Sequence, residues 1–341
     1  MNDFETTKSG YVVVTDTIPN DGSADVSDAL QKLIDDNPNR TIYFPDGTYI
    51  LGKPILTPAH PKKSVALKLS TYAVLKAADG WDSDEAMVRL GASYPANDIY
   101  TIGSNYSFTG GIVDGSGVAK GISIDGGRET MIRDVSIKHV KIGIHIKYGA
   151  NSGSSDADIF GVNIIGNGAI DSVGVLLEGY DNTLTNMRIA RVFTGIELRS
   201  AGNSMRNLHP LYTCDYTDYG NSCGFLDYAG NNWYNFCYSD HFGIGFRTAS
   251  TERNRNVRNI YDSCFTMWYA ARGDVHTAFR ADGKFNSVLT NFNIGFHHQQ
   301  EKNVVLSVGE PGGRGVFNRL SVNPKKCTDD TYKEYLEGGL F

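Results

Sequence analysis

The chain has 341 residues, of which 40% are hydrophobic and 21% charged, so it is long enough to bury a sizeable core. Its net charge of −6 and the lack of a basic tract argue against nucleic acid as a partner. The amino terminus carries no apolar stretch, so we expect no signal peptide and no membrane span. The expected location is cytoplasmic, with a virion-associated chain or one trimmed of its leader as alternatives.

The first elements along the chain are a lead-in and a short helix. Four apolar residues recur at helical spacing: Val26, Leu30, Leu33 and Ile34. They predict an amphipathic helix over residues 24–36. Residues 40–51 then predict a strand, a Pro-Asp-Gly turn and a second strand. A helix in this place would cover the open apolar end of a solenoid.

An asparagine or aspartate recurs just before an apolar residue farther along the chain. The column is Asp134, Asn186, Asn207, Asn235, Asn259 and Asn291. From Asn186 onward its spacing is about 21 to 32 residues, which is typical of solenoids. An amide that recurs once per coil can stack on its copies and satisfy a buried polar turn.

A second column predicts one strand in each coil. Seven five-residue segments have mostly apolar second and fourth positions: 121–125, 143–147, 174–178, 195–199, 223–227, 243–247 and 276–280. This alternation is typical of strands with one buried face. Gly/Asn turns follow several of the segments. Short strands that coil in parallel between such turns predict an all-β, single-stranded right-handed parallel β-helix.

The entry segment also resembles that of a known superfamily. Asp21-Gly22 precedes a helix with Ala29-Leu30-Gln31, and Ile42-Tyr43-Phe44-Pro45-Asp46-Gly47-Thr48-Tyr49 follows. This order looks like the pectin-lyase-like right-handed β-helix superfamily of pectate-lyase-type lyases, polygalacturonase-like hydrolases, fructan-converting transferases and phage tailspikes. With the coil pattern, the resemblance covers nearly the whole chain and implies the fold. It implies no catalytic residue, because the polygalacturonase motifs and the aspartate cluster of calcium-dependent pectate lyases are missing.

We expect one β-helix domain over residues 1–341. Its expected parts are the lead-in and capping segment (1–52), irregular early coils (53–105), regular coils (106–322) and a C-terminal tail (323–341). A short helix over residues 328–337 would cap the end of the chain. Solenoids of this kind often assemble side by side, so a homotrimer is the expected oligomer.

Two insertions are expected to wall a groove on the outer face of one sheet, where β-helices place their function. They are residues 210–222 and 262–275, and both carry aromatic residues. Exposed aromatic rings stack on the apolar faces of sugars, whereas buried rings would pack the loops onto the coils. We predict that Trp268 and Tyr216 are stacking platforms.

The fifth position of the strand column is the sharper indication of a site. It reads Asp125, Lys147, Glu178, Arg199, Asp227, Arg247 and Arg280. These side chains should point outward on coils about 4.8 Å apart. Opposite charges at that spacing form stabilising ion pairs, which is the interpretation favoured for the early members. Asp227, Arg247 and Arg280 lie between or beside the insertions and predict a substrate site.

Hydrolysis of a glycosidic bond needs two carboxyl groups, about 5 Å apart for retention and about 6.5–9.5 Å for inversion. Asp227 is the expected general acid or nucleophile partner, with Glu197 or Asp240 as the second carboxylate. Coil spacing puts Glu197 roughly 8 Å from Asp227, which suits inversion. The expected substrate-binding residues are Arg247, Arg280, Trp268, Tyr216, Tyr238, His241, His276 and Arg272.

The sequence therefore predicts an enzyme that cleaves or rearranges a glycosidic bond in an oligo- or polysaccharide. One alternative is a polysaccharide lyase that acts on uronic-acid glycans by β-elimination. The other is a non-catalytic, tailspike-like glycan-binding protein. No cofactor or metal is expected, since the five cysteines have no metal-type spacing and are expected to be free thiols.

Overall fold

The computed structural model describes residues 10–58, 63–92, 106–148, 154–215, 217–249, 251, 257–269, 273, 275–298 and 302–340. The chain divides into two compact units, Met1–Asn167 and Gly168–Phe341. The expected single domain over residues 1–341 stays a prediction. No helix among the described residues is long and apolar enough to cross a membrane.

Parallel strands build the first unit in three runs. One run is β1 (Val12–Val13), β3 (Arg40–Phe44), β6 (Val65–Leu69), β9 (Ser107–Thr109), β13 (Met131–Arg133) and β17 (Asp158–Phe160). The next is β2 (Asp21–Asp25), β4 (Gly47–Leu51), β7 (Ala73–Ala77), β10 (Ile112–Asp114), β14 (Ser136–Val140) and β18 (Asn163–Gly166). The third is β5 (Ile55–Leu56), β8 (Ala86–Leu90), β11 (Lys120–Ile124) and β15 (Ile142–Ile146), and β12 (Gly127–Arg128) pairs with β16 (Ser154–Ser155).

This arrangement confirms the predicted right-handed parallel β-helix. Successive coils put apolar residues in vertical register, as in the fully buried column of Ile42, Leu67, Phe108, Ile132 and Ile159. Burying each such side chain contributes about 1.5–3 kcal/mol. Regular pairing already includes β6, β7 and β8, so the irregular coils expected over residues 53–105 are not irregular where the structure describes them.

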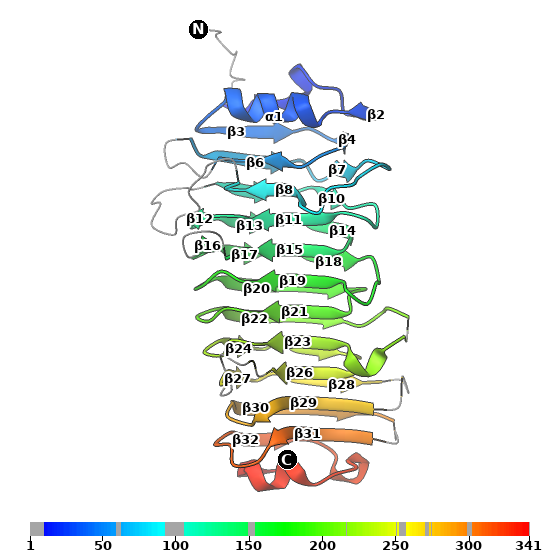
Figure 1. The fold of residues 1–341 in the computed structure, drawn as a ribbon, viewed down its shortest axis with the longest axis vertical. Helices are drawn as coiled ribbons and strands as arrows, with labels where there is room; N and C mark the ends of the chain where they lie inside the picture. Colours follow the sequence, from blue (N-terminus) through cyan, green and yellow to red (C-terminus); the bar gives the residue numbers. More distant parts are fainter. Residues whose placement is uncertain are drawn as a thin grey trace. The chain divides into compact units, whose positions relative to one another are not determined.

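The predicted amphipathic helix is α1 (Ser27–Asp36), which lies across the end of the first unit beside β3 (Figure 1). It starts later than expected, because residues 21–25 form β2. Asp25 Oδ1 accepts a hydrogen bond from the Ser27 backbone N–H at the start of the helix. Leu30, Leu33 and Ile34 form the buried face of α1, as a cap on an apolar coil end requires.

The second unit repeats the same architecture. One group of strands is β20 (Thr183–Ala190), β22 (Ser204–Leu211), β24 (Trp233–Asn235), β25 (Tyr238–Asp240), β27 (Ile260–Asp262), β28 (Phe265–Trp268), β30 (Val288–Phe296), β32 (Val316–Ser321) and β33 (Leu336–Leu340). The other group, named here the β19 sheet, is β19 (Val173–Leu177), β21 (Thr194–Leu198), β23 (Cys223–Asp227), β26 (Ile244–Thr248), β29 (Val275–Lys284) and β31 (Lys302–Glu310). The helix expected over residues 328–337 is instead a 3₁₀ turn, Thr331–Tyr335, followed by β33.

An asparagine ladder is present, but of the column that the sequence suggested it includes Asn259 alone among its four buried members. The buried ladder is formed by Asn182, Asn203, Asn232 and Asn259. The side-chain oxygen of each of the last three accepts the backbone N–H of the asparagine one coil before, at 2.8–3.0 Å. It satisfies backbone donors that would otherwise be buried without a partner.

Two members of the predicted column do bond across coils, since Asn207 Nδ2 donates to Asn186 Oδ1 at 2.7 Å, but this pair is exposed, and most of the column has a second role. Asp134, Asn186, Asn207 and Asn291 have positive φ of 51–55° and form the corners at which a coil changes direction. Asparagine and aspartate tolerate this left-handed conformation better than most residues, which explains why they recur there. In the coil of Asn235 the corner residue is Phe236, with φ of 53°.

We predict that Asn203→Ala lowers the free energy of unfolding by about 1–3 kcal/mol, because it leaves the Asn182 N–H buried without its acceptor. Urea unfolding monitored by circular dichroism measures the change. Asn318→Ala, at an exposed position of β32, is the matched control and should change stability by less than about 0.5 kcal/mol. Equal losses in the two variants would contradict a special role for the ladder.

Candidate functional site

The parallel register of the β19 sheet decides which side chains face outward. The outward column is Leu176, Glu197, Leu226, Arg247, Arg280 and Ser307. The sequence alignment had placed Asp227 opposite Arg199 and Arg247, but Asp227 pairs with Leu198 and Thr248. A shift of one residue turns a strand side chain to the other face. The prediction that Asp227 points outward is therefore wrong.

Asp227 lies fully inside the coil. Its Oδ1 accepts the backbone N–H groups of Ala229 and Gly230, and its Oδ2 accepts hydrogen bonds from Asn232 and Tyr234 at 2.7–2.8 Å. Burial raises the pKa of this carboxyl. A substrate cannot reach it, and its carboxyl cannot face the same bond as that of Glu197. Asp227 instead ties the turn after β23 to the asparagine ladder.

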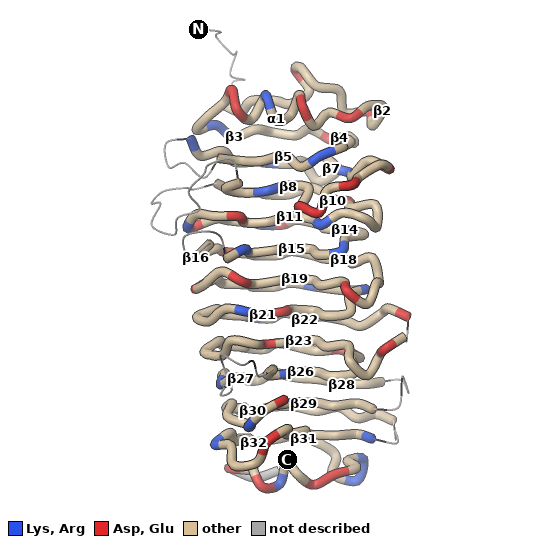
Figure 2. Tube along the Cα trace, in the orientation of Figure 1, with Lys and Arg blue, Asp and Glu red and all other residues tan. Residues whose placement is uncertain are grey.

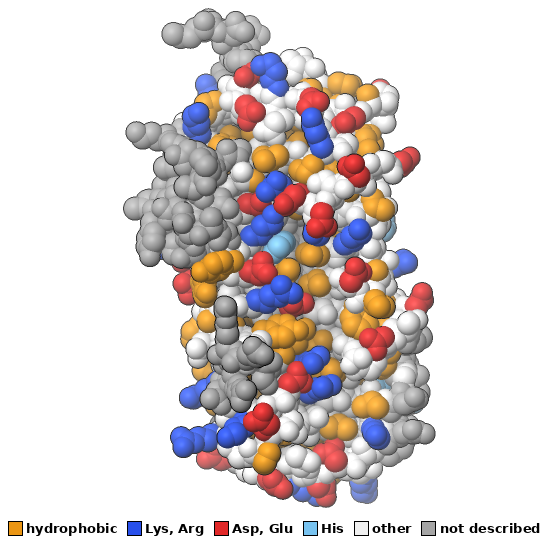
Figure 3. All heavy atoms as spheres, in the orientation of Figure 1, with side chains coloured by type: hydrophobic (Ala, Val, Ile, Leu, Met, Phe, Trp, Pro, Cys, Tyr) orange, Lys and Arg blue, Asp and Glu red, His pale blue; other side chains and the backbone are white. Residues whose placement is uncertain are grey.

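A pocket of about 590 Å³ lies at the carboxyl ends of β19, β21 and β23. It is lined by Tyr180, Arg199, Ser200, Ala201, Tyr228, Ala229 and Thr251. The insertion after β22 leads into the start of β23, so the pocket is at the opposite end of the strands from this loop. Figure 3 shows hydrophobic side chains gathered over β21 and β23, with charged side chains on both sides.

Arg199 forms the charged wall of the pocket between two carboxylates. Its guanidinium donates to Glu197 at 2.7 and 2.8 Å and to Glu178 at 3.1 Å. Burial by itself would lower the pKa of Arg199, but these two carboxylates outweigh burial and raise it. The Arg199 side chain is 51% exposed and that of Glu197 only 11%, so Glu197 binds the guanidinium from its buried side. The predicted pairing of Glu178 with Arg199 is confirmed.

A second arginine–carboxylate group lies on the next coils. Arg247 donates to both oxygens of Asp282, with the shortest contact at 2.7 Å, and Arg280 donates to the same carboxylate at 2.8 Å. Figure 2 shows acidic and basic positions on successive strands of the β19 sheet. Asp282 was missed in the sequence, although its place two residues after Arg280 in an extended strand puts both side chains on one face.

Tyr228 lies beside both charged groups. It is half-buried, and burial followed by the negative charge of Glu197 raises the pKa of its hydroxyl, which stays protonated and can donate. Tyr180 presents a second ring to the pocket and is 38% exposed. Both tyrosines were missed in the sequence. Their position could have indicated a site, since each tyrosine follows the end of a core strand by one to three residues.

Asp240 belongs to a different cluster, on β25. His241 and His209 both contact its carboxylate, His209 at 3.4 Å, and the Tyr238 ring stacks on His209 at 4.2 Å. His241 Nε2 accepts the Tyr269 N–H at 2.9 Å, so Nδ1 carries the proton that is donated to Asp240. Because Asp240 and Glu197 lie on different sheets, they cannot act across one glycosidic bond. The predicted pairing of Asp240 with Asp227 is wrong, because Asp227 is fully buried.

Other aromatic residues pack the loops rather than line a groove. Trp268 is fully buried, stacked between His276 and Phe296, and donates to the Phe242 carbonyl at 2.7 Å. His276 is buried as well. The predicted contacts of Trp268 and His276 with a substrate are therefore wrong. Tyr216 and Arg272 lie outside the described residues.

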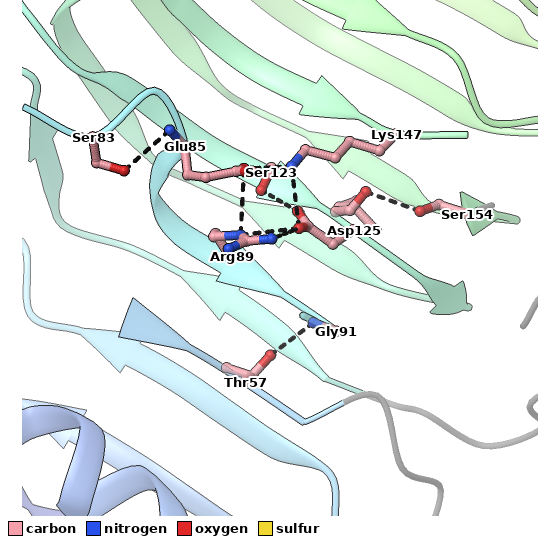
Figure 4. Close-up of polar contacts among 10 residues, drawn as sticks. Thr57, Ser83, Glu85, Arg89, Gly91, Ser123, Asp125, Lys147 and Ser154 are labelled. Atoms are coloured by element: carbon pink, nitrogen blue, oxygen red, sulfur yellow. Dashed lines mark hydrogen bonds and ion pairs between the residues drawn. The ribbon is translucent and has the colours of Figure 1, made fainter. Parts of the chain in front are cut away.

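The first unit carries an ion-pair network on the outer side of β8, β11 and β15 (Figure 4). Asp125 is 3% exposed and accepts from Arg89 at 2.6 and 2.9 Å and from Lys147 at 3.2 Å. Lys147 also contacts Glu85 at 2.5 Å. The predicted contact of Asp125 with Lys147 is confirmed. Because Asp125 also accepts from Arg89, its carboxylate links neighbouring coils. Among the residues that the structure describes, no three His, Cys, Asp or Glu side chains are grouped to hold a metal.

Fold and sequence together define a class and then a family. The architecture is that of the pectin-lyase-like right-handed β-helix proteins. The family model described as Rhamnogalacturonase A/epimerase, pectate lyase-like matches residues 12–217, and the chain belongs to this family. No curated protein matches the chain in sequence.

Solved structures share the fold at low identity. The Streptococcus pneumoniae surface adhesin PfbA matches with a TM-score of 0.62 and 11% identity over 97% of this chain and 95% of its own. The tailspike of E. coli bacteriophage HK620, in complex with a pentasaccharide, matches at 0.57 and 12% over 95% and 67%. The Yersinia enterocolitica family 28 exopolygalacturonase matches at 0.56 and 15% over 92% and 71%. The chain spans 61% of the Geobacillus virus E2 protein ORF18, which has the same fold.

We predict that Asp240→Asn lowers the free energy of unfolding at pH 7 by about 1–3 kcal/mol. Burial by itself would raise the pKa of Asp240, but hydrogen bonds from His209 and His241 outweigh it and hold the pKa well below its usual range. A depressed pKa gives stability that is present above about pH 4 and lost as pH falls through the folded-state value. Urea unfolding between pH 3 and 7 should show the difference from the unsubstituted chain shrinking in acid. Asp171→Asn, at an exposed position, should show no such trend.

Proposed function

We propose that the second unit binds an oligosaccharide in the pocket at the carboxyl ends of β19, β21 and β23. The observation that carries this proposal is the combination of two tyrosine rings, Tyr180 and Tyr228, with the guanidinium of Arg199 held in place by two carboxylates. Aromatic rings accept the apolar faces of sugar rings, and fixed ion pairs offer donors and acceptors to sugar hydroxyls.

The size and place of the pocket support the same conclusion. A volume of about 590 Å³ lies within the range of small-molecule sites, roughly 300–1,000 Å³. It opens on the outer face of a parallel sheet, in a chain whose family is named for enzymes of rhamnogalacturonan and pectate. The HK620 tailspike, with its pentasaccharide, and the exopolygalacturonase are glycan-related neighbours in fold.

Binding is better supported than cleavage. A glycosidase needs one protonated carboxyl as general acid and a second carboxylate across the bond. Among the described residues, Glu178 and Glu197 contact the pocket-lining Arg199, and both already accept its N–H groups. The sequence assigned Asp227 as one carboxylate and Glu197 or Asp240 as the other. Asp227 is fully buried, and Asp240 lies on a different sheet from Glu197. Hydrolysis, transfer and β-elimination are therefore the rival outcomes of the test.

A glycan array followed by mass analysis of the products tests the proposal. Binding without a change in glycan mass is the expected result. A gain of water, an internal anhydride or an unsaturated product would instead identify a hydrolase, a transferase or a lyase. No binding to any glycan would contradict the proposal.

We predict that Tyr228→Ala weakens binding of the selected glycan about 10- to 100-fold, because it removes a ring worth roughly 1.5–3 kcal/mol of buried apolar contact. Isothermal titration calorimetry measures the affinity, and thermal melting verifies that the variant is folded. Tyr72→Ala, which removes a 73% exposed tyrosine of the first unit, is the matched control and should bind as the unsubstituted chain does. Equal affinities of all three proteins would exclude the pocket as the site.

A further inference from the structure

Arg199 lines the pocket, and within the described residues its charge and those of the arginine–carboxylate group on the next coils balance one another. Three carboxylates, Glu178, Glu197 and Asp282, face three guanidinium groups, Arg199, Arg247 and Arg280. The sum of these six formal charges is zero. Each of these three arginines forms an ion pair with at least one of the three carboxylates.

The pairing is also close. Arg199 makes contacts of 2.7–3.1 Å with two acids, and Asp282 receives Arg247 at 2.7 Å and Arg280 at 2.8 Å. A uronate carboxylate that entered the pocket would have to displace Glu178 or Glu197 from Arg199, or compete with Asp282. It would also lie near those acids, and like charges in a partly desolvated site repel.

Sugar hydroxyls have no such conflict. A hydroxyl is both donor and acceptor, so it can accept from the N–H groups that Arg199 keeps free and donate to a carboxylate oxygen beside it. The protonated hydroxyl of Tyr228 supplies another donor. The apolar rings of Tyr180 and Tyr228, with Ala201 and Ala229, suit the C–H face of an uncharged sugar.

We infer that the ligand of this pocket is a neutral oligosaccharide rather than a polyuronate. This inference rests on the proposed glycan site. The inference differs from what the family description alone would suggest, because that description names enzymes of acidic glycans. It derives from the charges of this chain. The ion pairs hold these three arginines as hydrogen-bonding groups and cancel the positive field that the three would otherwise present to a polyanion.

The test uses matched glycan pairs. Each uronic-acid oligosaccharide in a panel is compared with its carboxyl-reduced form, which keeps length and linkage but replaces every carboxylate by a neutral hydroxymethyl group. The reduced member should bind at least about tenfold more tightly, with an affinity that changes less than twofold between 50 and 500 mM NaCl. Tighter binding of the uronate member, lost as salt is raised, would overturn the inference while leaving the proposed site intact. Failure of every glycan, acidic or neutral, would overturn both.

A charge variant gives a second readout. Glu178→Gln removes one partner of Arg199 and leaves the group with a charge of +1, so the affinity for the uronate member should rise about three- to tenfold at 50 mM NaCl. Glu129→Gln, at an exposed position of the first unit, makes the same change in net charge outside the group and should leave that affinity unchanged. An equal rise in both variants would show that only the overall charge matters, and no rise in either would contradict the role assigned to the ion pairs.

Discussion

The hydrogen-bond register between neighbouring parallel coils is the constraint on which the rest of this structure depends. Each strand alternates its side chains between core and solvent, so the register decides at once which residues are buried and which are exposed. In the β19 sheet, the column of Val175, Ile196, Phe225, Phe246 and Phe279 fills the interior. The Phe225 and Phe246 rings stack at 4.7 Å. A sliding register would expose these rings and bury charges, which the core does not tolerate.

Polar interactions at the turns reinforce the register. The buried asparagines bind the backbone of the neighbouring coil, and Asp227 binds both the ladder and the following turn. A buried carboxylate is costly unless donors surround it, and four donors surround this one. Asp227 therefore stabilises the turn, although an acid in an apolar strand suggests a catalytic residue when only the sequence is known.

The outer face uses charges differently. Arg199 and Asp282 each bridge two oppositely charged side chains, and each group spans adjacent coils. Exposed pairs of this kind add little stability. Among the described residues, the two groups together present fixed donors and acceptors, and their six formal charges sum to zero. This balance is the physical basis of the proposal that the pocket binds a neutral glycan.

The sequence by itself determined the β-helix, the capping helix and the ion pairs of Asp125 with Lys147 and Glu178 with Arg199. These follow from local periodicity and from spacings that repeat once per coil. Only the tertiary structure decided the faces of Asp227 and Trp268 and the position of the pocket. From β21 to β23 the coil length changes, and a register offset of one residue cannot be read from a single strand, since both faces there include apolar residues. The burial of aromatic residues in the loops likewise depends on neighbours distant in the chain, so their exposure could not be inferred from composition.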